Sequence, residues 1–350
     1  MTIDTNKTML QQVVTEPGNI IFNEVPIPKL SAQEVLVKIH MIGICGSDIH
    51  VMHGKHAFTP YPVTQGHEVS GEIVELGSHV TDLKVGDRVT IEPQVVCGVC
   101  HPCRHGKYNL CEELKVMGFQ TTGAASTFFA VDRKRITRLP SEMPFKDGAM
   151  IEPMAVAVHA INRMGDVTGM NVAVIGAGPI GNLIAQTAKG LGAAKTMITD
   201  ISDYRLDLAL ECGIDAAFNT KKVDFSEALI TAFGPDKADV IFDCAGTDES
   251  IGEAIKYARK GSTIILVAVF ADIAKVDLAV LNDHELDLNT SMMYRHEDYV
   301  EAIQLVNEGK VTLKPLQSKV FPFKEYQKAY EYIDKNQEHS MKIFIDVQNQ

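Results

Sequence analysis

The stretch that decides the fold is residues 171–181, NVAVIGAGPIG, in which an apolar run leads directly into glycines spaced as G-x-G-x-x-G. The apolar run predicts a buried strand, and residues 182–190 are typical of a helix. Gly176 then permits a tight turn, Gly178 lets the backbone approach a pyrophosphate, and Gly181 lets the helix pack close to the strand. Unpaired N–H groups at the helix N-terminus bind the anion. The predicted cofactor-binding residues of this dinucleotide site are Gly176, Gly178, Pro179, Ile180 and Gly181.

A second predicted strand ends at Asp200, about 20 residues beyond the glycines. At that position an acidic side chain accepts hydrogen bonds from the ribose hydroxyls and repels a 2′-phosphate. Arg205 follows closely and has two interpretations: a cofactor contact that softens this preference, or a solvated helix charge. The predicted cofactor is therefore NAD rather than NADP.

The chain has 350 residues, which favours two domains over a single core. Up to about Pro140 it contains short alternating runs typical of antiparallel β structure. Later, apolar strands alternate with helical stretches, which indicates a parallel sheet with crossover helices and an α/β fold class. The strand candidates of this second part are residues 171–175, 196–199, 240–243 and 263–267.

The pattern changes again from about Tyr294, with amphipathic stretches at 299–307 and 324–335 and a closing strand at 341–347. We expect this tail to pack back on the first domain. The predicted domains are therefore residues 1–156 with 294–350, and a doubly wound parallel-sheet domain at 157–293.

Four of the seven cysteines lie within one short stretch, in a predicted lobe of about residues 92–115. Four thiolates close a tetrahedral zinc shell and leave no open position, so we expect a structural zinc. His101 and His105 share this stretch, and because the shell is already complete we expect them at the surface. The predicted ligands are Cys97, Cys100, Cys103 and Cys111.

A second group of metal-ligating residue types is dispersed: Cys45, the pair His67 and Glu68, and Glu152. Their spacing alone does not join them. Taken singly, each has another interpretation: an inert buried thiol, a turn histidine, a surface carboxylate or a charge at a helix start.

Residues 66–71, GHEVSG, with Gly77 beyond them, resemble the signature of the zinc-containing alcohol dehydrogenases. Residues 86–89, GDRV, the cysteine-rich stretch and the glycine-rich turn follow in the same order as in that family, so the resemblance covers nearly the whole chain. It implies a GroES-like β-rich catalytic domain, a Rossmann domain and an active-site cleft between them.

Residues 151–154, IEPM, are similar to the polyol (sorbitol or L-iditol-type) dehydrogenases, whereas simple alcohol dehydrogenases tend to have a cysteine at position 152. The resemblance implies that Cys45, His67 and Glu68 hold a catalytic zinc, with Glu152 bound directly or through a water. Val51 stands where sorbitol dehydrogenases tend to have an aromatic residue, which argues against sorbitol itself as the substrate.

The same resemblance implies an oxidoreductase that moves a hydride from a secondary alcohol of a polyol to NAD, giving a ketose. Sugar acids, sugar phosphates and threonine-like substrates are the alternatives, and a non-catalytic nucleotide sensor is a further one. Glu68 and Glu152 belong to the predicted catalytic centre, and Asp48 is expected to orient His67. The implied proton relay is Ser47 and His50, and the implied substrate contacts are Phe119, Tyr294 and Arg295.

The formal charge of −12 and the pI near 5.5 argue against a nucleic-acid partner, because such proteins carry basic surfaces. No run approaches the roughly 18 apolar residues of a membrane span, and the N-terminal residues contain no signal-type apolar region. We expect a cytoplasmic protein with a small-molecule substrate. The family further implies a homo-oligomer, a tetramer or dimer, to which the apolar run 264–270 could contribute a sheet edge.

Overall fold

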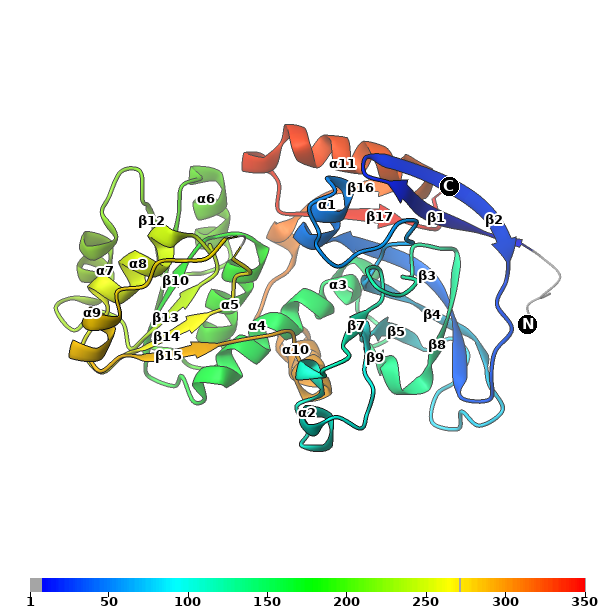
Figure 1. The fold of residues 1–350 in the computed structure, drawn as a ribbon, viewed down its shortest axis with the longest axis horizontal. Helices are drawn as coiled ribbons and strands as arrows, with labels where there is room; N and C mark the ends of the chain where they lie inside the picture. Colours follow the sequence, from blue (N-terminus) through cyan, green and yellow to red (C-terminus); the bar gives the residue numbers. More distant parts are fainter. Residues whose placement is uncertain (1–7, 271, 350) are drawn as a thin grey trace. The chain divides into compact units, whose positions relative to one another are not determined.

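The computed structural model describes residues 8–270 and 272–349, and the chain divides into two compact units (Figure 1). Unit 1 comprises Met1–Glu152 and Gln317–Gln350, and unit 2 comprises Pro153–Leu316. The chain therefore leaves the first unit once and returns to it once.

Unit 2 is built on a six-stranded sheet in which every neighbouring pair is parallel. The order β12-β11-β10-β13-β14-β15 is that of a doubly wound dinucleotide-binding fold. Central strands of such a sheet are covered on both faces, and β10 is buried accordingly at every position after Asn171. The strands are β10 (Asn171–Ile175), β11 (Lys195–Asp200), β12 (Ala216–Asn219), β13 (Val240–Asp243), β14 (Thr263–Leu266) and β15 (Asp287–Thr290).

Helices connect these strands and surround the sheet in the green to orange part of Figure 1. Together with the strands they enclose a core that includes Ala173, Phe225, Ile241 and Ile255. Among the described helices, none is both long and apolar enough to cross a membrane. The helices are α4 (Ile151–Met164, whose first two residues belong to unit 1), α5 (Pro179–Gly190), α6 (Asp203–Glu211), α7 (Phe225–Phe233), α8 (Asp248–Tyr257), α9 (Leu278–Asp283), α10 (His296–Asn307) and η3 (Lys314–Leu316).

The predicted edge strand differs from the observed one. β14 ends at Leu266 and lies between β13 and β15, so the apolar run 264–270 does not form a sheet edge. The edge on this side of the sheet is β15, whose sequence DLNT has three polar residues out of four and is half-buried to exposed. Its composition gave no apolar signal because none of its side chains is fully buried.

Unit 1 is built on a mixed seven-stranded sheet of order β16-β17-β3-β4-β5-β9, with β8 also paired to β3. Strands β1 and β2 form a separate hairpin, and β6 pairs with β7. The bounds are β1 (Thr8–Glu16), β2 (Asn19–Pro26), β3 (Glu34–Ile44), β4 (Glu68–Leu76), β5 (Arg88–Ile91), β6 (Gln94–Val95), β7 (Lys115–Val116), β8 (Phe128–Asp132), β9 (Ile136–Arg138), β16 (Gln317–Pro322) and β17 (Lys342–Asp346).

The helices of unit 1 are short apart from α11, which packs its apolar face into the core with Tyr326, Tyr330 and Ile333. β17 lies beside β3, so the returning tail contributes both a helix and a central strand to this unit. The helices are α1 (Gly46–Met52), α2 (His101–Arg104), η1 (Tyr108–Leu110), η2 (Arg133–Arg135), α3 (Phe145–Ala149), η4 (Phe323–Glu325), α11 (Tyr326–Lys335) and η5 (Gln337–His339).

The return to unit 1 occurs at Gln317, later than the Tyr294 expected from the sequence. The reason is α10, which is tied to α4 by polar contacts within unit 2. His159 Nδ1 lies 2.8 Å from Asp298 Oδ2, and Asn162 donates to Asp298 Oδ1 at 3.1 Å. Burial alone would raise the pKa of Asp298, but the hydrogen bond with His159 is the main influence that lowers it.

Candidate metal centres and dinucleotide site

Cys45, His67 and Glu68, which we call the mixed site, come together because two strands of unit 1 pair there. Gly43 of β3 lies opposite Glu68 of β4, so the ends of these strands carry the three residues side by side. One potential ligand atom from each lies within 4.8 Å of the others. His67 and Glu68 are buried, while Cys45 is half-buried at the N-cap of α1. A thiolate, an imidazole and a carboxylate are a set that zinc binds in catalytic sites.

Glu68 has a buried cation as its partner. Lys342 Nζ, on β17, lies 2.7 Å from both carboxylate oxygens and 3.3 Å from the carbonyl oxygen of Ile44. Burial alone would lower the pKa of Lys342, but the charge of Glu68 is the main influence that raises it. A carboxylate has about four acceptor positions, so this salt bridge leaves positions for a metal. A Cβ at Gly43 would meet Glu68 Oε2, so a larger residue there would displace this carboxylate from its place beside Lys342.

His67 faces a second buried carboxylate. Its Nδ1 lies 3.6 Å from Asp48 Oδ1, and the N–H of Cys45 donates to Asp48 Oδ2 at 3.0 Å. Burial alone would lower the pKa of His67, but Asp48 and, to a smaller extent, Cys45 raise it well above its usual value.

The other residues predicted around this centre are less tightly gathered. Glu152 is buried in the first turn of α4 but is not part of the 4.8 Å set, although its charge contributes to raising the pKa of Lys342. Ser47 is half-buried and His50 is exposed, and both lie on α1. Residues three apart on a helix share a face, so these two side chains lie along one side of α1.

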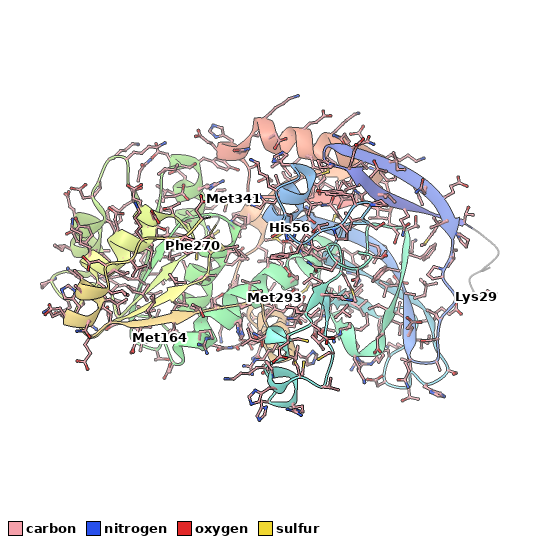
Figure 2. The ribbon with its side chains drawn as sticks, viewed as in Figure 1. Lys29, His56, Met164, Phe270, Met293 and Met341 are labelled. Carbon is pink, nitrogen blue, oxygen red and sulfur yellow. The ribbon has the colours of Figure 1, made fainter. Side chains whose placement is uncertain are left out.

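Phe119 is buried beside His67. Its ring centroid lies 4.9 Å from that of His67 and 4.7 Å from that of His56, which is labelled in Figure 2. Thr59 Oγ1 lies 2.7 Å from His56 Nδ1. Phe119 therefore separates the imidazole of the mixed site from a second histidine in the loop after α1.

The four predicted structural ligands, which we call the four-cysteine lobe, also converge. Their sulfurs lie within 4.8 Å of one another, and none forms a disulfide. The N–H of Cys100 points at the sulfur of Cys97 at 3.3 Å, and that of Cys97 at the sulfur of Cys111, also at 3.3 Å. Hydrogen bonds from the N–H groups of Glu112 and Cys103 lower the pKa of Cys100 to about 7, whereas burial raises the pKa of Cys103 to about 12. His101 and His105 are exposed and stack on each other at 4.0 Å, as expected for surface residues.

The glycine-rich turn of unit 2 has the geometry that its sequence predicts. Gly176 adopts φ +98°, and a Cβ at Gly181 would collide with the carbonyl oxygen of Gly176. A Cβ at Gly178 would meet no protein atom, so this residue leaves open space beside the N-terminus of α5. Asp200 accepts hydrogen bonds from the N–H of Ala177 at 2.7 Å and lies 3.9 Å from the guanidinium of Arg205. A dinucleotide fits this arrangement.

Comparison with known proteins follows the same division of the chain. Residues 31–141 match the alcohol dehydrogenase GroES-like domain, and residues 179–308 match the zinc-binding dehydrogenase domain. Probable D-xylulose reductase A of Arthroderma otae is 37% identical over 89% of this chain and 90% of its own length. Sorbitol dehydrogenase 1 of Saccharomyces cerevisiae is 34% identical over 91% and 93%. A Sinorhizobium meliloti protein assigned as a zinc-binding dehydrogenase, solved with NADP bound, superposes with a TM-score of 0.90 at 28% identity, covering 97% of this chain and 99% of that one.

This chain belongs to the polyol group of the zinc-dependent medium-chain alcohol dehydrogenases. It is therefore an oxidoreductase, and its family uses zinc and a nicotinamide dinucleotide. The GroES-like and Rossmann-type domains expected from the sequence are confirmed.

Two residues that the resemblance links to substrate lie in unit 2 of this dehydrogenase, directly after Met293, which has φ +53° and is labelled in Figure 2. Tyr294 is almost fully buried and packs edge-on against Tyr299. Arg295 is the N-cap of α10, and its Nη1 lies 3.0 Å from Glu297 Oε1. The guanidinium is therefore partly neutralised by its own helix.

Sequence reasoning missed three buried residues near the mixed site of the dehydrogenase. Lys342 interrupts the apolar strand 341–347, and a charge inside such a strand was a signal that it needs a partner. Gln65 and Tyr330 hydrogen-bond to each other at 2.7 Å. They gave no signal, because a polar residue before Gly66 is ordinary in a turn and a tyrosine suits an amphipathic helix.

Proposed function

We propose that this dehydrogenase oxidises a secondary alcohol of a polyol to a ketone, giving a ketose, with NAD as the hydride acceptor. The observation that carries the proposal is the mixed site, where Cys45, His67 and Glu68 offer three ligand atoms within 4.8 Å. One of the relatives is named for a polyol and the other for a ketose, which supports this substrate class.

The ligand sets support two zinc ions in different roles. The four-cysteine lobe offers four sulfurs and so completes a tetrahedral shell, whereas the mixed site offers three ligands and leaves a position open. Glu152 would approach the same ion directly or through a water while the open position stays with the substrate, and its charge already acts on Lys342. Zinc held in the mixed site supplies Lewis-acid polarisation of the substrate hydroxyl, and the nicotinamide accepts the hydride.

The residues around the mixed site supply orientation and a proton path. Asp48 keeps the imidazole of His67 in place. Ser47 accepts the proton that the substrate hydroxyl loses and passes it towards His50, which is exposed and delivers it to solvent. Phe119 supplies an apolar wall beside His67 that keeps bulk water away from the reacting carbon.

Asp200 supports NAD over NADP. Its carboxylate lies at the end of β11, where it accepts from the N–H groups of Ala177 and Ser202. A 2′-phosphate would add negative charge beside this buried carboxylate. Arg205 lies 3.9 Å away and tempers the repulsion, so we expect a preference rather than an absolute restriction.

A neutral polyol is favoured over an anionic substrate. Arg295, the cation that we linked to substrate, is paired with Glu297, which reduces its attraction for a carboxylate or phosphate. Val51 is fully buried and offers no aromatic ring at the position where sorbitol dehydrogenases tend to have one. We therefore expect a polyol other than sorbitol to be the preferred substrate.

We also propose a cytoplasmic homo-oligomer, a tetramer or dimer. All seven cysteines are free, which suits a reducing compartment. One edge of the sheet of unit 2 is β15, a short and mostly polar strand with one unpaired side that a second copy can cover.

The test is a substrate panel with the purified, zinc-loaded protein. Polyols, sugar acids, sugar phosphates and threonine are each offered with NAD and with NADP, and reduced nicotinamide is followed by absorbance. We expect turnover with a polyol and NAD. Turnover only with a sugar acid or sugar phosphate would change the proposed substrate class to that one. If no substrate is turned over with zinc present, a nucleotide-binding protein without catalysis is favoured.

A further inference from the structure

A continuous buried hydrogen-bond network connects the C-terminal helix of unit 1 to the mixed site. It begins at Asp48, which is fully buried and faces His67. One oxygen of Asp48 is held by the N–H of Cys45 at 3.0 Å. The other oxygen faces His67 Nδ1 at 3.6 Å, a distance that closes to a hydrogen bond with a shift of about 0.5 Å.

Gln65, also fully buried, continues the network from Asp48. Its Nε2 donates to the Asp48 carbonyl oxygen at 3.1 Å and approaches Asp48 Oδ1 at 3.4 Å. Both groups only accept, so the amide nitrogen must face Asp48 and the amide oxygen must face away. That oxygen accepts from Tyr330, whose hydroxyl lies 2.7 Å from it. Each polar group in this series of hydrogen bonds therefore fixes the orientation of the next.

Helix α11 provides two buried tyrosines that differ in whether their hydroxyl is hydrogen-bonded. Tyr326 and Tyr330 lie one turn apart, are both buried, and stack with ring centroids 5.8 Å apart. The hydroxyl of Tyr330 is bonded to Gln65, whereas that of Tyr326 has no hydrogen-bond partner among the described residues. Only Tyr330 is therefore connected to Asp48.

We propose that Gln65 and Tyr330 are positioning residues for the metal of the mixed site: through Asp48 they hold the His67 imidazole with Nδ1 inward and its other ring nitrogen towards zinc. The inference rests on the proposed function for the identity of the ion. Outer partners of a metal-ligating histidine change metal affinity by about 10- to 100-fold when they are removed. Without Gln65, Asp48 retains the N–H of Cys45 but loses a group that fixes the orientation of its carboxylate towards His67.

The experiment measures zinc release from the zinc-loaded protein into excess chromogenic chelator. Two ions are expected to leave in two kinetic phases, and the variant Cys45→Ser identifies the phase of the mixed site because it lacks that phase. The ion of the four-cysteine lobe then serves as an internal reference in every variant.

We expect Gln65→Leu to accelerate the mixed-site phase about 10- to 100-fold and Tyr330→Phe by a smaller factor, about 3- to 10-fold. The matched control Tyr326→Phe removes an unbonded hydroxyl and should leave both phases unchanged. Cobalt substitution adds a spectroscopic measurement: the visible absorption of the mixed site should change in Gln65→Leu and Tyr330→Phe but not in Tyr326→Phe.

Mixed-site release at the original rate in Gln65→Leu and Tyr330→Phe would overturn the inference. Equal acceleration of both phases, or an effect of Tyr326→Phe as large as that of Tyr330→Phe, would also overturn it, because either result indicates general loosening of α11. If Cys45→Ser keeps both zinc phases, the proposed catalytic metal site itself fails, which is a separate outcome.

Discussion

The four-cysteine lobe and the mixed site are built in opposite ways. The lobe takes four ligands of one kind from a single stretch of 15 residues, Cys97 to Cys111, with backbone N–H groups directed at the sulfurs. The mixed site takes three ligands of different kinds from the ends of β3 and β4. It is surrounded by the buried side chains of Asp48 and Lys342.

The difference teaches how each site obtains its function. One loop can supply all four sulfurs of a closed shell, and the bound metal then stabilises the fold of that loop. An open shell has to keep one coordination position free for substrate. The surrounding fold must therefore fix each protein ligand so that none of them moves into that position. The experiments below test whether the two sites separate in this way.

The largest expected effect comes from removing one thiolate at each site. Cys45→Ser should lower kcat/KM by about 10³-fold or more with little change in the melting temperature, since this site supplies several kcal/mol of polarisation. Cys100→Ser should lower the melting temperature and the zinc content more strongly than it lowers kcat/KM. Steady-state kinetics and thermal unfolding of both variants are the measurements. Full activity in Cys45→Ser would end the distinction between the sites.

The second effect concerns the buried ion pair. Lys342→Met leaves the Glu68 carboxylate buried without its cation and should lower the free energy of unfolding by about 3–5 kcal/mol. The matched control is Lys260→Met, which breaks the exposed pair with Asp283 and should have a much smaller effect. Urea unfolding of both variants is the measurement, and equal losses would argue that burial of the mixed site is unimportant.

The third effect distinguishes proton transfer by Ser47 from binding of the cofactor. Ser47→Ala should lower kcat by about 10²-fold while leaving the KM for NAD nearly unchanged, because the hydroxyl moves a proton and does not hold the cofactor. The measurement is a full kinetic series across pH. Unchanged turnover at every pH would remove Ser47 from the mechanism.

The smallest effect is expected at the four-cysteine lobe. His101→Ala and His105→Ala should change neither zinc content nor activity, and the free energy of unfolding should move by less than about 0.5 kcal/mol, since both side chains are exposed and four sulfurs complete the shell. Metal analysis and unfolding are the measurements. Loss of zinc in either variant would mean that a histidine takes part in that shell.

Features carried by short stretches could be predicted from the sequence. The turn at Gly176, the placement of Asp200 at the end of its strand and the convergence of the four-cysteine lobe all depend on residues close together in the chain. Cys45, His67 and Glu68 could be joined only through the family resemblance, because their spacing carries no geometric information. Their meeting in space follows from the register of β3 and β4.

Other features depend on pairings that no local pattern encodes. The partnership of Glu68 with Lys342, the network through Gln65 and Tyr330 and the packing of α10 on α4 each join distant segments. The edge position of β15 was missed for the same reason, since strand order is a property of the whole sheet.

The salt bridge between Glu68 and Lys342 spans 274 positions of the chain. A ribosome that adds about 5–20 residues each second needs roughly 15–55 seconds to travel from one partner to the other. During this interval the mixed-site ligands are already made, but the cation that accompanies Glu68 in the interior does not yet exist. We therefore expect this centre to be completed only after β17 has been made, and a truncation shortly before Lys342 would leave the distant Glu68 without its buried cation.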